Sequence, residues 1–230
     1  MPKFKTIHIC LPVIFLLLTA LLLLNSCAWM VVAQVREGDM TGVERHLGRG
    51  TDVNAKDLGG HTALGTAARE GRLDIAMLLI DYGALVDARG AMGSTPLMLA
   101  SAEGHEDMVR FLIASGADVN ARRPVFYCTE SVSLLGEPVH RTYINPSTPL
   151  MAASAQGHSD IVLLLLDFGA DVNFFDEEGY TALRWASQQE HEMTGTVFQT
   201  VNVLVEAGAM DPSVSVTRNE SGEIIGFELR

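Results

Sequence analysis

The sequence has few cysteines and few cations, and it contains no acidic residue before Glu37. Three cysteines in 230 residues are too few for a small fold held by several disulfide bonds. The 16 lysine and arginine residues stand against 28 aspartate and glutamate residues, for a net charge of −12. Because nucleic-acid binding needs basic surface to replace counterions, this composition argues against it. It leaves small molecules and basic proteins as partners.

Sequence motifs of catalysis and cofactor binding are also missing. No Gly-x-Ser-x-Gly nucleophile elbow occurs, and the glycine-rich run 90–93 lacks the Lys-Ser/Thr of a phosphate-binding loop. His105 and His158 follow equivalent glycines, so we expect polar residues at helix starts rather than metal ligands, and the other histidines lack partners at ligand spacing. We therefore predict a protein that is not an enzyme, with no cofactor, no metal and no evident small-molecule substrate.

The N-terminal segment contains Lys3 and Lys5 and continues as an apolar run that Pro12 interrupts. A basic start before a short apolar run is typical of a secretory signal. The next residues, Leu24-Asn25-Ser26-Cys27, resemble the lipobox of bacterial lipoprotein precursors. The resemblance implies that residues 1–26 are a cleaved signal peptide and that Cys27 carries acyl chains such as palmitate. Without these 26 residues, which hold two lysines and no acid, the net charge is −14.

An uncleaved membrane anchor is the alternative, because residues 7–33 form an apolar stretch long enough to span a bilayer. Both interpretations place the body outside the bacterial cytoplasm, since a basic N-terminal region stays inside. Ala28, rather than aspartate, follows the cysteine, which resembles outer-membrane sorting. We therefore favour a lipid anchor on the periplasmic side of the outer membrane over the inner membrane.

The rest of the chain is an internal repeat. Gly38, Gly71 and Gly104 are spaced by 33 residues, whereas Gly157 follows after 53. The 20 additional residues are one insertion in an otherwise regular array. A single unit of this length cannot bury both of its faces, so stacking between neighbours must supply the core.

The repeated sequence is specific, since the segment from Thr95 to His105 recurs with few changes from Thr148 to His158. It resembles the ankyrin repeat, which has two antiparallel helices and a β-hairpin finger in each unit. The resemblance covers about residues 28–211 and implies an all-α repeat solenoid, an ankyrin-repeat stack of about five units. We place the ankyrin-repeat domain at 27–211, with the insertion within 122–147 as one extended finger.

Local signals agree with this fold. We expect Thr95 and Thr148 to cap helices that begin with proline, and Gly104 and Gly157 to end those helices in the left-handed conformation. After them, residues 212–230 contain two alternating apolar segments around a turn signal. They predict a β-hairpin that caps the C-terminal end of the solenoid; a disordered tail is the alternative.

Ankyrin arrays bind other proteins through finger tips and the concave face of the first helices, so the resemblance implies this function here. The candidates on regular fingers and first helices are Met92, Phe174, Phe175, Tyr180 and Trp185. For Phe174 and Trp185, a packed core aromatic is the alternative. The insertion adds arginine and aromatic residues, which are favoured at interface centres: Arg122, Arg123, Phe126, Tyr127, Arg141 and Tyr143. An incidental mobile loop is the alternative for the insertion.

We therefore expect an envelope-anchored ankyrin-repeat lipoprotein that acts as a non-catalytic protein-binding scaffold, or as an inhibitor or immunity-type protein, in the periplasm. A redox or stress-protection factor is the alternative from a different class. It rests on Cys128, the cysteine outside the leader and the lipobox, which has arginines near it in the sequence. Since no second cysteine remains in the body, we expect no intramolecular disulfide bond.

Overall fold

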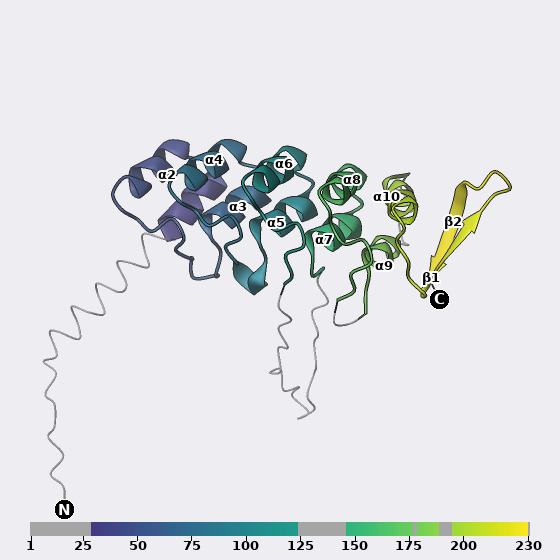
Figure 1. The fold of residues 1–230 in the computed structure, drawn as a ribbon. Helices are drawn as coiled ribbons and strands as arrows, with labels where there is room; N and C mark the ends of the chain where they lie inside the picture. Colours follow the sequence, from purple (N-terminus) through teal and green to yellow (C-terminus); the bar gives the residue numbers. More distant parts are fainter. Residues whose placement is uncertain (1–28, 124–145, 177–178, 189–194, 230) are drawn as a thin grey trace, which may run out of the picture.

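The computed structural model describes residues 29–123, 146–176, 179–188 and 195–229. In this part of the chain, helices follow one another in pairs, and the pairs stack side by side in two layers (Figure 1). The outer layer holds α2 (Met40–Leu47), α4 (Leu73–Asp81), α6 (Glu106–Ala114), α8 (Ser159–Asp167) and α10 (Gly195–Glu206). The inner layer, from which the fingers project, holds α3 (Ala63–Arg69), α5 (Pro96–Glu103), α7 (Pro149–Gln156) and α9 (Ala182–Ser187). A helix at 29–37 precedes α2.

Each of these inner helices starts at a threonine whose hydroxyl oxygen accepts a hydrogen bond from the backbone N–H three residues later. The capping residues are Thr62, Thr95, Thr148 and Thr181. Gly104 and Gly157 end α5 and α7 with φ angles of 82° and 76°, a left-handed conformation that costs glycine little. The predicted starts and ends of both helices are confirmed.

One apolar core runs through the stack. Leu79, Leu112 and Leu165 of the outer layer have 0% exposed surface, and so have Ala100 and Ala153 of the inner layer. The small inner residues let successive inner helices approach closely, so that α5 packs on both α3 and α7, and α9 packs on α7. The predicted distribution of the core between neighbouring units is therefore confirmed.

Two histidines connect neighbouring units next to Gly71 and Gly104, the glycines at the ends of α3 and α5. The ring Nε2 of His105 donates to the backbone oxygen of Arg69 (2.8 Å), and that of His158 donates to Ala102 (3.1 Å). A Cβ atom on Gly104 would come within 2.7 Å of the His158 ring. The glycine is thus required twice, for its positive φ and for the space that the next unit's ring occupies. The two histidines hold the stack together, as polar residues just before their helices.

Asparagine side chains form a second ladder at the start of the fingers, next to glycines that follow the outer helices. Asn54, Asn120 and Asn173 each donate Nδ2 to a glycine carbonyl of the following unit and accept a backbone N–H from the same loop. The unit between the first two has Asp87, which accepts the Asp118 N–H at 3.2 and 3.3 Å. A carboxylate has no hydrogen to donate, so this rung is incomplete.

The C-terminal residues form the expected hairpin. Strands β1 (Val214–Arg218) and β2 (Ile224–Leu229) pair antiparallel, with Val216 opposite Phe227 and a register shift next to Arg218. Ile224 and Phe227 are buried, and the hairpin packs on α9, at the end of the inner layer (Figure 1). It therefore covers apolar surface that a further repeat would otherwise cover.

None of the helices in the described ranges is long and apolar enough to cross a bilayer. Cys27 and the apolar leader lie outside these ranges. Cleavage and lipidation therefore stay predictions.

Candidate protein-binding surface

The segments that lead into the four inner helices are the fingers: 54–62, 87–95, 120–148 and 173–181, which the structure describes except for residues 124–145 and 177–178. The first and the fourth are short hairpins, each closed by one antiparallel bridge, Lys56 with Thr62 and Phe175 with Thr181. The second differs from the expected hairpin, because 91–93 form a single 3-10 turn and the Gly90 N–H bonds to the Ser94 carbonyl. Together with the exposed side chains of the inner helices, the described residues of these fingers form the surface that we call the finger edge.

Met92, a predicted binding residue, lies at the tip of the second finger. Its φ of 52° is the one positive value among non-glycine residues in the described ranges, and its side chain is 65% exposed. A left-handed conformation costs a residue with a Cβ about 1–2 kcal/mol. The fold therefore holds an apolar side chain in water on a backbone that glycine would adopt more easily.

A buried aspartate organises the fourth finger. Asp176 is 5% exposed and accepts the Tyr180 backbone N–H at 2.7 Å and the Trp185 ring N–H at 3.4 Å. The Tyr180 and Trp185 rings lie 5.5 Å apart at a tilt of 40°, a common geometry for attractive ring pairs. Trp185 is half-buried and packs on the core. The core contact of Trp185 is confirmed, and its role in binding stays a prediction.

Two arginines lie on aromatic rings of this same finger. The guanidinium carbon of Arg122 is 4.2 Å from the centre of the Phe174 ring, and that of Arg184 is 4.0 Å from the centre of the Tyr180 ring. Phe174 is half-buried against the core. Arg184 was not predicted as a binding residue. The sequence did mark it as unusual, because it stands where ankyrin units have the histidine of Thr-Pro-Leu-His.

Phe175 extends the aromatic surface outward. Its ring is 67% exposed and stacks beside Phe174, with centroids 6.4 Å apart and an interplanar angle of 11°. The structure thus brings Phe174, Phe175, Tyr180 and Trp185 together with Arg122 and Arg184. Met92 lies on a separate finger.

Two hydrogen bonds lie at the base of the third finger, one between backbone groups and one from an arginine side chain. The Arg123 N–H donates to the Ser147 carbonyl at 2.8 Å, and Arg89 of the second finger donates to the Arg122 carbonyl at 2.6 Å. Arg123 is half-buried, and this burial lowers the pKa of its guanidinium group. Four predicted binding residues of the insertion lie outside the described residues: Phe126, Tyr127, Arg141 and Tyr143. The same holds for Cys128.

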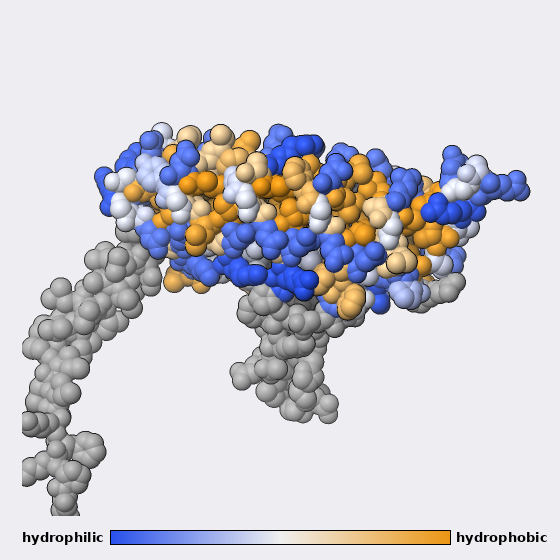
Figure 2. Space-filling model, in the orientation of Figure 1, coloured by the Kyte–Doolittle hydropathy of each residue, from blue (hydrophilic) through white to orange (hydrophobic). Residues whose placement is uncertain are grey.

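Basic residues form a column on the fingers, among a few acids such as Asp57 and Asp87, and acids are numerous on the outer side of the stack. On the fingers, the second position after the ladder residue is Lys56, Arg89 and Arg122 in turn, and Arg123 follows. The outer helices and the loops after them carry acids on exposed or half-exposed positions: Asp74, Asp81, Glu106, Asp107, Asp118, Asp160, Asp167, Asp171 and Glu206. Arg110, which pairs with Glu106 at 2.6 Å, is one of the few bases there. Figure 2 shows hydrophilic residues along the edge from which the fingers project.

Comparison with known proteins assigns the family. The sequence matches the family "Ankyrin repeats (3 copies)" over residues 29–123 and 128–215, most of the chain. The chain belongs to the ankyrin-repeat family. Ankyrin repeats are protein–protein interaction scaffolds and are generally non-catalytic, which agrees with the expected fold and with the coarse function.

Two relatives illustrate how far this likeness extends. The chain is 43% identical over 60 residues to glycerophosphocholine phosphodiesterase gde1 of Schizosaccharomyces pombe and 42% identical over 187 residues to the potassium channel AKT1 of Arabidopsis thaliana. These matches cover 26% and 76% of this chain, but 5% and 21% of the two relatives. The chain thus spans a small part of either relative, and the names describe much larger proteins.

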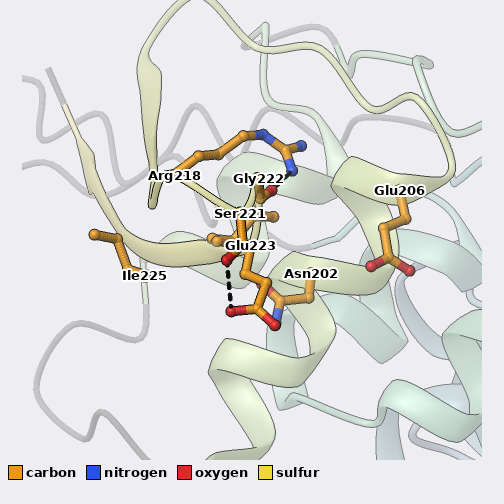
Figure 3. Close-up of a pocket in the computed structure, with 8 residues that line it drawn as sticks. Asn202, Glu206, Arg218, Ser221, Gly222, Glu223 and Ile225 are labelled. Carbon is orange, nitrogen blue, oxygen red and sulfur yellow. Dashed lines mark hydrogen bonds between the residues drawn. The ribbon is translucent and has the colours of Figure 1, made fainter.

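A concave region lies at the C-terminal end of the ankyrin stack, between α10 and the hairpin turn (Figure 3). It encloses about 470 Å³ and is lined mainly by polar residues, among them Asn202, Glu206, Arg218 and Glu223. Arg218 donates to the Gly222 carbonyl at 2.7 Å, so its guanidinium group partly serves the turn. In the described ranges, no group of three or more His, Cys, Asp or Glu residues is placed to hold a metal ion. The finger edge therefore remains the stronger candidate site.

Proposed function

We propose that the finger edge from the second finger to α9 binds a protein partner. The observation that carries this proposal is the exposed Phe175 beside two arginines that lie on aromatic rings. An exposed phenylalanine adds little burial to the stack, whereas burying it against a partner removes apolar surface from water. Aromatic and arginine side chains also dominate the binding energy of many interfaces.

Site-specific photocrosslinking tests this proposal in the native cell. A photoreactive phenylalanine at position 175 should form a defined adduct with one or a few proteins. The matched control is the same residue at Leu163, which is 46% exposed on the outer helix α8. Equal adducts from both positions, or adducts from position 163 alone, would move the interface away from the fingers.

We further propose that the insertion of the third finger extends this interface. The distance from Asn120 to Thr148 is 28 residues, against eight from Asn173 to Thr181, and the additional residues include arginines and aromatics. Replacing residues 122–147 with the length and pattern of a regular finger should leave cooperative unfolding intact and reduce the crosslinking from position 175. Undiminished crosslinking in a well-folded variant would show that the insertion is not part of the interface.

We propose that the protein is anchored in the periplasm by a lipid on Cys27, after cleavage of residues 1–26. The lipobox-like sequence Leu24-Asn25-Ser26-Cys27 supports this proposal. A palmitate analogue should label the wild-type chain and not Cys27→Ser, and inhibition of the lipoprotein signal peptidase should accumulate the precursor. A Cys27→Ser protein that stays in the membrane at unchanged size would instead support an uncleaved span.

We propose an inhibitor or immunity-type role for the complex, because a non-catalytic surface acts by covering part of its partner. Once crosslinking identifies the partner, an equimolar amount of the purified chain should suppress its activity. A partner that keeps full activity in the saturated complex would make the chain an assembly scaffold.

A further inference from the structure

Resting on this proposed function, we propose that the finger edge recognises an acidic segment of its partner. The carboxylates of this segment bind Arg122, Arg123 and Arg184, and its apolar side chains lie against Phe175. The partner is thus identified by its chemistry: a chain segment in which aspartate or glutamate alternates with apolar residues.

The first support is the geometry of the stacked arginines. A guanidinium group that lies over a ring uses its flat face for that contact and keeps the N–H groups of its edge for a carboxylate. The guanidinium carbons of Arg122 and Arg184 lie 4.2 and 4.0 Å from the centres of the Phe174 and Tyr180 rings, distances that suit such a contact. Because the rings restrict the motion of both side chains, binding loses less side-chain entropy than it would with free arginines.

The second support is that these arginines form no close side-chain ion pair within the described residues, although the charge of Arg184 also acts on the Asp211 carboxylate. The described residues contain two side-chain ion pairs, Asp57–His61 and Glu106–Arg110, and neither includes an arginine of this surface. The Nε atoms of Arg123 and Arg184 are enclosed without a hydrogen-bond partner in the same part of the chain. Enclosed donors without acceptors are rare and costly in folded proteins. A carboxylate that binds the accessible N–H groups of these guanidinium groups supplies a close ion pair that the described residues do not.

The third support is the separation of charge across the stack. Taken as a whole, the acidic chain favours a basic partner. At physiological salt, however, charges are screened over about 8 Å, and packed helix layers are about 8–10 Å apart. The acids of the outer layer therefore contribute little at the finger edge, where Arg89, Arg122, Arg123 and Arg184 lie among a few acids, namely Asp57, Asp87, Glu103 and the buried Asp176. An acidic segment is attracted to this edge and repelled by the outer helices, which orients the partner.

Fluorescence anisotropy with the full chain and two labelled probe peptides tests the inference. One probe alternates glutamate with leucine, and the other alternates lysine with leucine. We expect the glutamate probe to bind, with an affinity that falls as salt rises. The double variant Arg122→Gln/Arg184→Gln should weaken its binding by about tenfold or more, because two charged contacts with the probe are lost.

A matched control separates local contact from general charge. Arg45→Gln/Arg110→Gln removes the same two charges from exposed positions of the outer helices α2 and α6, and it should leave binding of the glutamate probe within about twofold of wild type. Arg122→Lys/Arg184→Lys keeps the charge and loses the planar edge, so it should bind with intermediate affinity. These substitutions also serve if the glutamine variant fails to fold.

Three results would overturn the inference: preferential binding of the lysine probe, no binding of either probe, or an equal loss in the finger-edge and outer-helix double variants. None of them removes the proposed function by itself. If position 175 still crosslinks to a partner in cells, the finger edge binds a protein whose recognised segment is not acidic. If position 175 yields no adduct, the proposed function fails whatever the probes do.

Discussion

Replacing Asp87 with asparagine should stabilise the protein. Asn54 shows what the side chain at this ladder position can do: Nδ2 donates to the Gly83 carbonyl at 3.2 Å, and Oδ1 accepts the Leu85 N–H at 2.8 Å. Asp87 makes only the accepting half, to Asp118, at 3.2 and 3.3 Å. The Asp87→Asn amide should complete the rung by donating to the equivalent carbonyl, at Gly116.

The size of the gain follows from the chemistry of the rung. A neutral hydrogen bond contributes about 0.5–1.5 kcal/mol, and the substitution also removes one acid from an acidic chain. In a protein of this size, each kcal/mol shifts the unfolding midpoint by about 2–4 °C. We therefore expect the melting temperature of Asp87→Asn to rise by about 1–6 °C in thermal unfolding followed by circular dichroism.

Two variants control for charge and test the rung in reverse. Glu220→Gln removes one acid from the exposed turn of the C-terminal hairpin, where no ladder runs, and should change the midpoint little. Asn120→Asp deletes the donor to the Gly169 carbonyl at 3.0 Å and should lower the midpoint by a similar amount. If Asp87→Asn gains no more than Glu220→Gln and Asn120→Asp loses nothing, the side-chain ladder does not contribute to stability as argued.

Three further outcomes test the fold. Leu112→Ala should cost about 2–5 kcal/mol in urea unfolding, while Leu163→Ala, at a position 46% exposed, should cost much less; equal losses would contradict the assigned core. Gly104→Ala should destabilise more than Gly116→Ala, although both positions have positive φ, because only the first Cβ would meet the next unit's histidine ring; calorimetric midpoints in the opposite order would refute this. Although burial raises the pKa of Asp211, hydrogen bonds from Ser213 and Thr181 and the charge of Arg184 hold it below its ordinary value. The stability that Asp211 contributes is therefore present above about pH 4 and lost as the pH falls through its lowered pKa, so Asp211→Asn should flatten the acid limb of a stability–pH profile.

The local parts of this fold could be predicted from the sequence because their causes are local. Thr95 caps the helix that Pro96 begins, and Gly104 ends it, through contacts within a few residues. The 33-residue spacing then placed these signals at the same points of successive units. The alternation around the turn at 219–222 likewise predicted the C-terminal hairpin.

The surface could be predicted only in part, because its contacts join residues that the sequence separates. Arg122 reaches Phe174 in the next finger, and Asp176 fixes the Trp185 ring from nine positions away. The repeat pattern could mark Phe175 as exposed, but it did not single out Arg184. The overall acidic charge also concealed the basic column on the fingers, since a sum over the chain carries no information about position.

The insertion in the third finger lengthens the chain without changing the contacts between the units on either side of it. Asn120 bonds to the Asp171 N–H and the Gly169 carbonyl across the insertion with the same two contacts that Asn54 makes across a regular unit. The Arg123–Ser147 backbone bond closes the base of this finger. Foreign segments grafted between residues 123 and 146 should therefore be displayed without disturbing the helices, which makes this position a natural attachment point for engineered recognition loops.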